Sequence, residues 1–271
     1  MEDYLNSFIC LDEEKMPYPR ICAHRGFSTV APENTMPAYG AAIALGAEEI
    51  ELDLWATTDG VIVSCHDAKL ERISSGTGFV DEHSYADLLK LDFGSKEGGE
   101  KFAGLKIATF EDILSKFGRH TIMNVHVKAR DDWNPLPDQT LISIIDLIRK
   151  YGSEKYVYFM SGSPSILEAL ERLAPDIARC AGADERNGKP VYDLVDKALK
   201  YHCTKIQIYK PHFKCFGPDY LPDLIKRAHD NGILCNMFYA DDPDEAKQFV
   251  EMGCDTILTN NFLKVYNAVK G

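Results

Sequence analysis

Eight short apolar runs alternate with segments of helical period along the 271 residues, and this alternation predicts a (β/α)8 TIM barrel. The length agrees, because a barrel of this class typically takes about 250 residues. A doubly wound open sheet is the alternative, but no G-x-G-x-x-G or P-loop sequence follows the first strand to support a nucleotide-binding form of it. We therefore expect a single TIM-barrel domain over residues 1–271.

The predicted strands are runs rich in Val, Ile, Leu, Tyr and Phe that are bounded by turn residues. In chain order they are RICAH from 20, EEIELDL from 48, TIMNVHV from 121, YVYFM from 156, DIARCA from 176, TKIQI from 204, ILCNMFY from 233 and DTILT from 255. Segments with apolar residues every three or four positions lie between them, at 35–46, 109–118, 138–152, 164–174, 191–202, 219–232 and 244–253. Several of these end in Gly, as helices often do. Parallel strands covered by helices on the outside follow from this pattern.

One stretch departs from the alternation, and it comes after the second strand. Residues 59–108 contain a further apolar run, VIVSC, and then the Gly-rich segments SSGTG and FGSKEGGEKFAG. The Asp59-Gly60 dipeptide is a strong hairpin signal, so we expect the second strand to turn back antiparallel beyond the barrel rim. The rest, about 67–108, is predicted to be a small insertion at one end of the barrel.

Charge and hydropathy exclude several classes of partner. The 42 acidic residues outnumber the 30 basic ones, and the formal net charge of -12 argues against a broad nucleic-acid or anionic-membrane surface. No run of about 18 apolar residues is present to span a membrane. The N-terminus, MEDYLNSFICLDEEK, is acidic where a signal peptide would be basic. We expect a cytoplasmic protein that acts on a small molecule, with its oligomeric state left open.

The strand NVHVK carries an unusual polar face. Side chains alternate along a strand, so Asn124, His126 and Lys128 share one face, and Val125 and Val127 share the other. In a half-buried antiparallel strand, the polar face would simply meet water. In a barrel the helices cover the outside, so the valines face outward and the three polar groups point inward. Near the C-terminal ends of barrel strands, such groups lie where enzymes of this fold perform chemistry.

Other strand ends add ionisable groups. The first strand closes with His24 and Arg25, the second carries Glu51 and Asp53, and its hairpin extension ends at His66. The two carboxylates are two positions apart and face the same side, where burial is costly unless a cation compensates. A divalent metal ion is the simplest compensation. Each signal is weak alone, but a barrel brings these strand ends to one mouth.

The residues that carry these groups also carry a resemblance. The string AHRGFSTVAPENTMPAYGAAIALGAEEIELDLWATTDGVIVSCHD resembles the glycerophosphodiester phosphodiesterase family, with its HRG, PENT, E-x-D and HD motifs in the same order. Downstream, LERISSGTG, LLKLDFGSK and FAGLKIATFEDIL are similar to the family's insertion that covers the active site. NVHVK and AHDNGILCNMFYADDPDEAKQFVEMGCDTILTN fit as well. The resemblance covers about residues 20–262.

The resemblance implies a TIM-barrel hydrolase that uses one divalent metal ion. The family cleaves glycerophosphodiesters to glycerol 3-phosphate and an alcohol. Carried over by position, the resemblance implies that His24 and His66 form the acid/base pair and that Glu51 and Asp53 are metal ligands. Such roles suit the chemistry, because a phosphodiester needs its charge neutralised, its nucleophile deprotonated and its leaving alkoxide protonated.

Five further positions are expected on the substrate side of the site. Arg25 and Lys128 match family residues that face the phosphate. Glu33 and Asn34 belong to the PENT turn, which helps to order the site. Phe238 stands where the family commonly has tryptophan and is expected either beside the alcohol or as a buried aromatic of the barrel.

Two departures from the family pattern bear on chemistry. NVHVK aligns with a strand that usually reads like NIEIK, so His126 occupies the position of a third carboxylate ligand. The usual T-D-x-P reads Thr259-Asn260-Asn261-Phe262. The family resemblance implies magnesium or calcium, which prefer oxygen ligands, whereas the imidazole of His126 favours manganese or another transition metal.

Two other functions stay open beside the hydrolase. A more distant resemblance to the spider-venom phospholipase D proteins, which share the barrel and the paired histidines, implies a lyase that expels the alcohol through a cyclic phosphate. A non-enzymatic relative would keep the phosphate pocket and bind phosphate esters without turnover, because His126 weakens its metal site.

Overall fold

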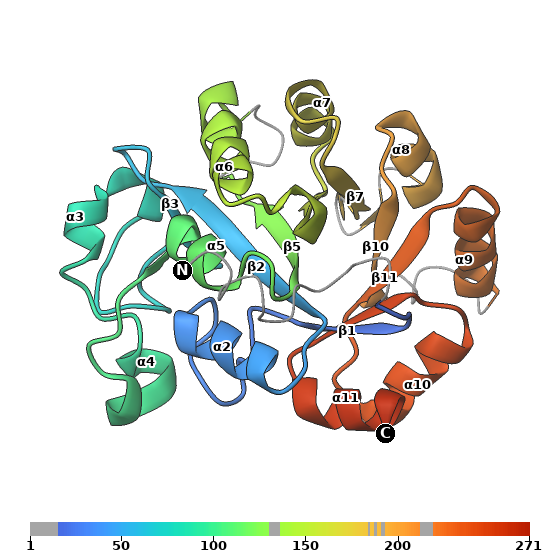
Figure 1. Cartoon of the computed structure of the whole chain (residues 1–271), viewed down its shortest axis with the longest axis horizontal. Coiled ribbons are helices and arrows are strands. Elements are labelled where there is room, and N and C mark those ends of the chain that lie inside the picture. Colours follow the sequence, from blue (N-terminus) through green and yellow to red (C-terminus); the bar gives the residue numbers. More distant parts are fainter. Residues whose placement is uncertain (1–15, 130–135, 184, 187–188, 191–192, 212–218) are drawn as a thin grey trace, which may run out of the picture.

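The computed structural model describes residues 16–129, 136–183, 185–186, 189–190, 193–211 and 219–271, and its centre is a closed ring of parallel strands (Figure 1). Around the ring they are β1 (Arg20–Ala23), β12 (Thr256–Thr259), β11 (Leu234–Phe238), β10 (Lys205–Tyr209), β7 (Ala178–Gly182), β6 (Val157–Ser161), β5 (Ile122–Val127) and β2 (Glu49–Ala56). Pairing of β1 with β2 closes the barrel. The predicted TIM barrel is confirmed, and each predicted strand is one of these eight.

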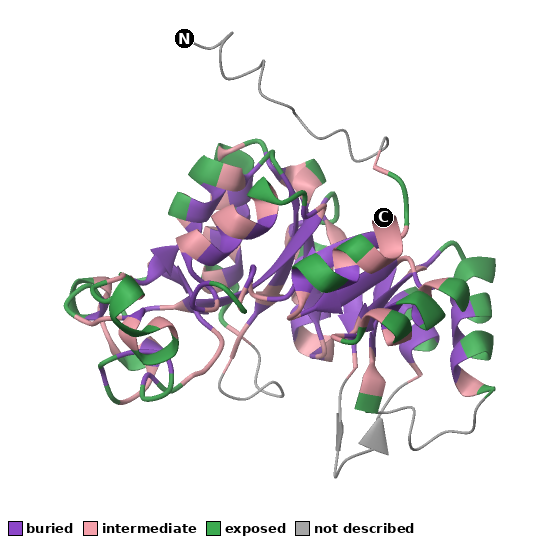
Figure 2. Cartoon of the chain, turned by 90° about the horizontal axis from the view of Figure 1, so that it is seen from below, coloured by how far each residue is buried: buried purple, intermediate pink, exposed green. Residues whose placement is uncertain are grey.

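Helices surround the ring on its outside (Figure 1). They are α2 (Met36–Ala44), α5 (Phe110–Phe117), α6 (Asp138–Lys150), α7 (Pro164–Leu173), α8 (Leu194–Lys200), α9 (Tyr220–Asp230), α10 (Pro243–Glu251) and α11 (Phe262–Lys270). Figure 2 shows the strands buried and the helices buried on one side only, as amphipathic helices over a barrel should be. Among the described residues no helix is long and apolar enough to cross a membrane. Residues 1–15, on whose charge we based the expected location, lie outside the described part.

The alternation along each strand separates an apolar outer layer from a polar interior. On β5, Val125 and Val127 belong to the core between barrel and helices, and Asn124 is fully buried inside the barrel. Its side-chain amide donates to Gln207 Oε1 on β10 at 3.0 Å. The inward orientation predicted for the polar face of NVHVK is therefore confirmed. Parallel pairing places Asp53 of β2 beside His126.

Buried polar groups close the barrel at the N-terminal ends of its strands. Arg20 Nη1 lies 3.3 Å from Glu49 Oε1, and the Tyr158 hydroxyl donates to Glu49 Oε2 at 2.9 Å. Asn236 Nδ2 in turn donates to the Tyr158 hydroxyl at 3.0 Å. Because the charged pair has hydrogen-bonding partners, its burial is tolerated here.

The excursion after β2 is a hairpin followed by a small insertion with its own core. β3 (Ile62–Ser64) pairs antiparallel with β2, as the Asp59-Gly60 turn predicts, and it also pairs antiparallel with β4 (Ala108–Thr109). Between them lie the short elements η2 (Val80–Glu82), α3 (Tyr85–Leu88), α4 (Ser95–Gly98) and η3 (Gly99–Phe102). A second apolar cluster, which includes Trp55, Leu70, Phe93 and Ile107, anchors this region beside the barrel. β8 (Glu185–Arg186), β9 (Lys189–Pro190) and η4 (Glu154–Tyr156) complete the described elements.

Candidate active site

A cavity of about 360 Å³ opens at the C-terminal ends of the barrel strands. Eight of the ten residues that the sequence predicts for the site line it: His24, Arg25, Glu51, Asp53, His66, His126, Lys128 and Phe238. They come from β2, β5 and β11 and from the segments that follow β1, β3 and β5. This is the end of the barrel at which enzymes of the fold place their active sites.

Two buried carboxylates form the floor of the cavity. Asp53 Oδ1 lies 3.0 Å from Lys128 Nζ and 3.3 Å from His126 Nδ1, and Glu51 Oε2 accepts the backbone N–H of Arg25 at 3.1 Å. Burial, with the negative charge of Asp53 added, raises the pKa of Glu51 well above its usual range. Burial acts in the same direction on Asp53, but the charge of Lys128 and the contact with His126 outweigh it and hold the pKa of Asp53 well below its usual range. The positive charges of Arg25 and Lys128 act on Glu51 as well, but they do not offset the effect of its burial and of Asp53 on its pKa.

The donor set fits a divalent cation at this point. Glu51, Asp53 and His126 each offer a ligand atom, and these three atoms lie within 4.8 Å of one another. Asp53 Oδ1 is a buried oxygen that accepts no hydrogen bond, although Lys128 Nζ and His126 Nδ1 lie near it. Two oxygens and one imidazole nitrogen form a mixed set, suited to ions that accept both donor types.

His24 is held from behind by an amide. Its Nδ1 lies 2.7 Å from Asn260 Oδ1, and its Nε2 lies 3.7 Å from Glu51 Oε2. The ring also contacts Phe238 edge-on, with centroids 4.9 Å apart. Burial, reinforced by the positive charge of Arg25, lowers the pKa of His24 to about 4. A neutral imidazole of this kind has one bare nitrogen available to accept a proton.

His66 has a different partner behind its ring. Its Nδ1 lies 2.7 Å from Asp67 Oδ1, so a carboxylate supports the ring where an amide supports His24. Burial lowers the pKa of His66, and the nearby Asp53 charge acts in the opposite direction. Both histidines thus engage Nδ1 away from the cavity, as a pair of positioned proton carriers would.

The PENT turn lies behind the cavity wall. Asn34 is 2% exposed, and its amide donates to Asp53 Oδ2 at 3.0 Å and accepts the Asp53 N–H at 3.1 Å. Glu33 accepts from Arg25 Nη1 at 3.0 Å through each carboxylate oxygen. We expected Glu33 and Asn34 among the substrate-binding residues, but neither lines the main cavity. Their contacts instead position Asp53 and Arg25, in agreement with an ordering role for the turn.

The HRG turn explains why glycine follows Arg25. Arg25 has φ 58° and Gly26 has φ 80°, a conformation that residues with a Cβ rarely adopt. A Cβ on Gly26 would lie 2.7 Å from the backbone carbon of Ala38, at the start of α2. This close approach allows the chain to reverse after β1, with the Arg25 N–H directed at Glu51 and the guanidinium at Glu33.

Arg72 is a residue of the site region that the sequence reasoning missed. It lies in the insertion and donates to Glu33 Oε1 at 2.6 Å, to Glu97 Oε1 at 2.7 Å and to Asp67 Oδ1 at 3.0 Å. Hydrogen bonding to Arg72 lowers the pKa of Asp67 to about 2. Arg72 therefore connects the carboxylate behind His66 with the one behind Arg25. Arg72 follows Asp67 by five residues, and this spacing alone does not indicate a contact between them.

Replacing Arg72 with Ala should lower kcat by about tenfold or more, because a small misplacement of reacting groups has large effects on rate. Without the guanidinium, Asp67, Glu33 and Glu97 repel one another, and both His66 and Arg25 lose a fixed partner. Arg119→Ala, at an exposed turn before β5, is the matched control and should leave kcat near the wild-type value. Steady-state kinetics with a melting curve would decide, and an unchanged kcat for Arg72→Ala would contradict a positioning role.

The remaining wall of the cavity is more apolar. Its residues are Met160, Gly162, Gly182, Ala183, Gln207, Tyr209 and Leu258, with Phe238 stacked against Tyr209 at 5.9 Å between ring centroids. The resemblance implied that the insertion covers the active site, but no described residue of 67–108 lines this cavity. The insertion approaches from behind, where Ile73, Phe93, Glu97 and Ile107 line a separate, smaller cavity.

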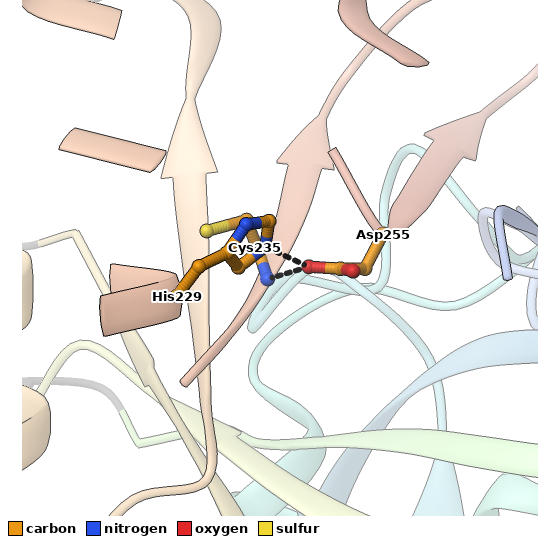
Figure 3. A group of neighbouring side chains, drawn as sticks. All are labelled: His229, Cys235 and Asp255. Carbon is orange, nitrogen blue, oxygen red and sulfur yellow. Dashed lines mark hydrogen bonds and ion pairs between the residues drawn. The ribbon is translucent and has the colours of Figure 1, made fainter. Parts of the chain in front are cut away.

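A second group of potential metal ligands lies at the N-terminal ends of the barrel strands, opposite the cavity. Figure 3 shows its three side chains. The group comprises His229 at the end of α9, Cys235 in β11 and Asp255 just before β12. Asp255 Oδ2 already accepts from His229 Nε2 at 2.8 Å and from the Cys235 N–H at 2.7 Å. Burial raises the pKa of the Cys235 thiol, which keeps it protonated. These contacts fasten α9 to the N-terminal ends of the strands, a structural role.

Comparisons with known proteins agree with this geometry. Residues 24–264 match the model of the glycerophosphoryl diester phosphodiesterase family. A glycerophosphodiester phosphodiesterase of Caldanaerobacter subterraneus is 30% identical over 92% of this chain and 97% of its own length. One from Bacillus subtilis is 28% identical over 88% of this chain and 82% of its own length.

Solved structures show the same fold. An Oleispira antarctica phosphodiesterase, solved in complex with the product sn-glycerol-3-phosphate, superposes with a TM-score of 0.80. It is 23% identical and covers 94% of this chain and 98% of its own. A glycerophosphodiester phosphodiesterase from Agrobacterium tumefaciens has a TM-score of 0.75 at 24% identity, over 93% of this chain and 100% of its own.

Proposed function

The chain belongs to the glycerophosphoryl diester phosphodiesterase family of phosphoric diester hydrolases, and we propose that it hydrolyses glycerophosphodiesters to glycerol 3-phosphate and an alcohol. The observation that carries the proposal is the convergence of two histidines on one cavity, each held through Nδ1 by a side chain behind it. We further propose that residues 1–271 form one domain, on the basis of the closed barrel.

Arg25 and Lys128 are proposed to neutralise the phosphate. Both line the cavity, and each is held by a carboxylate, Arg25 by Glu33 and Lys128 by Asp53. Fixed cations of this kind stabilise charge that builds up on the phosphoryl oxygens without having to reorganise during the reaction. Phe238 and Tyr209 are proposed to flank the alcohol portion, because their rings form the apolar side of the same cavity.

His24 is proposed as the proton acceptor and His66 as the proton donor. The attacking hydroxyl, from water or from the glycerol 2-position, gives its proton to the bare Nε2 of His24. Where the 2-hydroxyl attacks, a cyclic phosphate forms, and water opens it to glycerol 3-phosphate in a second step. His66 delivers a proton to the alcohol oxygen as its bond to phosphorus breaks. The partners support this order, because the carboxylate of Asp67 brings a full negative charge to an imidazolium, whereas Asn260 offers His24 only the dipole of a neutral amide.

Glu51, Asp53 and His126 are proposed to hold one divalent cation, which when bound would supply Lewis-acid charge next to the phosphate. Their placement on adjacent strands, with Asp53 paired to His126 in the register, gives the three donors a rigid support. Imidazole in the set favours manganese or another transition metal over calcium.

The test is product analysis with a panel of glycerophosphodiesters and several divalent metals. We expect glycerol 3-phosphate and free alcohol in equal amounts. Cyclic phosphate as the final product would select the phospholipase D-like lyase instead. Tight binding of the ester with no alcohol released in any metal would select the non-enzymatic relative.

A further inference from the structure

A chain of three side chains leads to the catalytic cavity from behind His24. Asp241 lies just beyond β11, Asn260 just beyond β12, and His24 just beyond β1. Asn260 Nδ2 donates to Asp241 Oδ2 at 2.9 Å, and Asn260 Oδ1 lies 2.7 Å from His24 Nδ1. Asp241 Oδ1 also accepts the Asn260 N–H at 2.7 Å and the Thr259 hydroxyl at 3.0 Å. The carboxylate is therefore fixed by donors from Thr259 and from Asn260.

The orientation of the Asn260 amide follows from its neighbour. An ionised carboxylate only accepts hydrogen bonds, so Asp241 must face the amide nitrogen of Asn260. That leaves the amide oxygen toward His24, and because this oxygen also only accepts, His24 must donate from Nδ1. Its Nε2 is then bare and faces Glu51 and the cavity. We propose that Asp241, acting through Asn260, is a positioning residue that holds His24 in the tautomer with a bare Nε2.

The pair also gives a reason for a departure from the family pattern. The usual T-D-x-P has an aspartate where this chain has Asn260, which would place a carboxylate directly against the imidazole. Here the carboxylate belongs to Asp241, which contacts His24 only through the side chain of Asn260. A carboxylate at position 260 would lie about 3 Å from that of Asp241, where like charges repel strongly. The effects of substitutions at Asn260 and Asp241 should therefore be coupled. Exchanging the amide and the carboxylate at both positions should be tolerated, whereas a change at one position alone should not.

Exchange of the two residues tests this coupling. In D241N/N260D the amide introduced at position 241 can still accept from the backbone N–H of position 260 and from the Thr259 hydroxyl. Its nitrogen can donate to the carboxylate introduced at position 260, and that carboxylate can accept from His24 Nδ1. We expect N260D and D241N each to lower kcat by at least tenfold with KM changed less than threefold. The double variant should recover kcat to within about threefold of wild type, whereas additive effects would lower it about 100-fold or more, so the coupling is about 2 kcal/mol or more when converted as RT ln of the ratio.

Nitrogen-15 NMR of labelled histidine supplies a readout that does not require turnover. His24 should show the Nδ1–H tautomer in the wild type and in the double variant, and D241N should populate the Nε2–H form. N267D is the matched control, because Asn267 is exposed on α11 and does not line the cavity. Its kcat and its His24 tautomer should match wild type.

The expected changes in kcat rest on the proposed function. The proposed function and the positioning role of Asp241 are nevertheless contradicted by different results. A wild type that releases no glycerol 3-phosphate while its His24 tautomer depends on Asp241 would defeat the function and leave the positioning intact. An active wild type whose double variant is no better than the worse single variant, or whose His24 carries its proton on Nε2, would overturn the positioning role. Melting curves identify any single variant that fails to fold, and the NMR spectrum of the wild type decides in that case.

Discussion

His66→Ala should slow the release of an unactivated alcohol by about 10²- to 10⁴-fold, the usual contribution of a well-placed acid. The same variant should lose much less activity on a nitrophenyl ester. A nitrophenolate leaves without a proton, so a missing proton donor is scarcely felt, whereas choline or glycerol must be protonated as it departs. Comparing kcat/KM on the two substrate types therefore distinguishes loss of the proton donor from loss of any other group in the site.

His24→Ala should behave differently, because the proton acceptor is needed whatever the leaving group. We expect a loss of about 10²- to 10⁴-fold on both substrates. His120→Ala, at an exposed turn before β5 and away from the cavity, is the matched control and should retain wild-type rates on both. If His24→Ala were the variant rescued by the activated ester, the two roles would be exchanged. If either variant kept more than a tenth of wild-type rate on the unactivated ester, the acid/base pair itself would be wrong.

The barrel was predictable because hydrophobic periodicity depends only on local spacing. Each strand shows its apolar outer face, and the inward face of NVHVK stood out as Asn124, His126 and Lys128, which the structure confirms. Ligand pairs at spacing two, such as Glu51 and Asp53, are equally visible. These features require no knowledge of which strands are neighbours.

The rest of the site depends on contacts between distant segments, which spacing does not encode. Arg72 contacts Glu33, 39 positions earlier, and Asn260 contacts His24 across 236 positions. Nothing local marks Arg72. The sequence does show Asn260 as a departure from T-D-x-P, but the reason for that departure lies in the contact of Asn260 with Asp241. The sequence likewise does not show that Asn34 is buried behind the cavity wall. The PENT motif indicates a turn, but it does not indicate whether the side chains of that turn face the cavity.

Removing metal should abolish activity, and manganese should restore more of it than calcium. Calcium takes six to eight hard oxygen ligands, and here one of three protein donors is the imidazole nitrogen of His126, which reduces both the oxygen count and the negative charge. His126→Glu should reverse the order, raising calcium-supported activity and calcium affinity together. Asp53→Asn should weaken binding of either ion, because Asp53 supplies a buried oxygen with no hydrogen bond of its own.

Calorimetric titration of stripped protein with each ion gives the affinity independently of turnover. His229→Ala is the control at the opposite end of the barrel, and it should leave the titration unchanged if Asp255 there is occupied as a structural acceptor. Tighter binding of calcium than of manganese to the wild type would contradict the shift in preference. If the His126→Glu variant still preferred manganese, the imidazole of His126 would not be the cause of that preference, because the variant changes only the ligand at position 126.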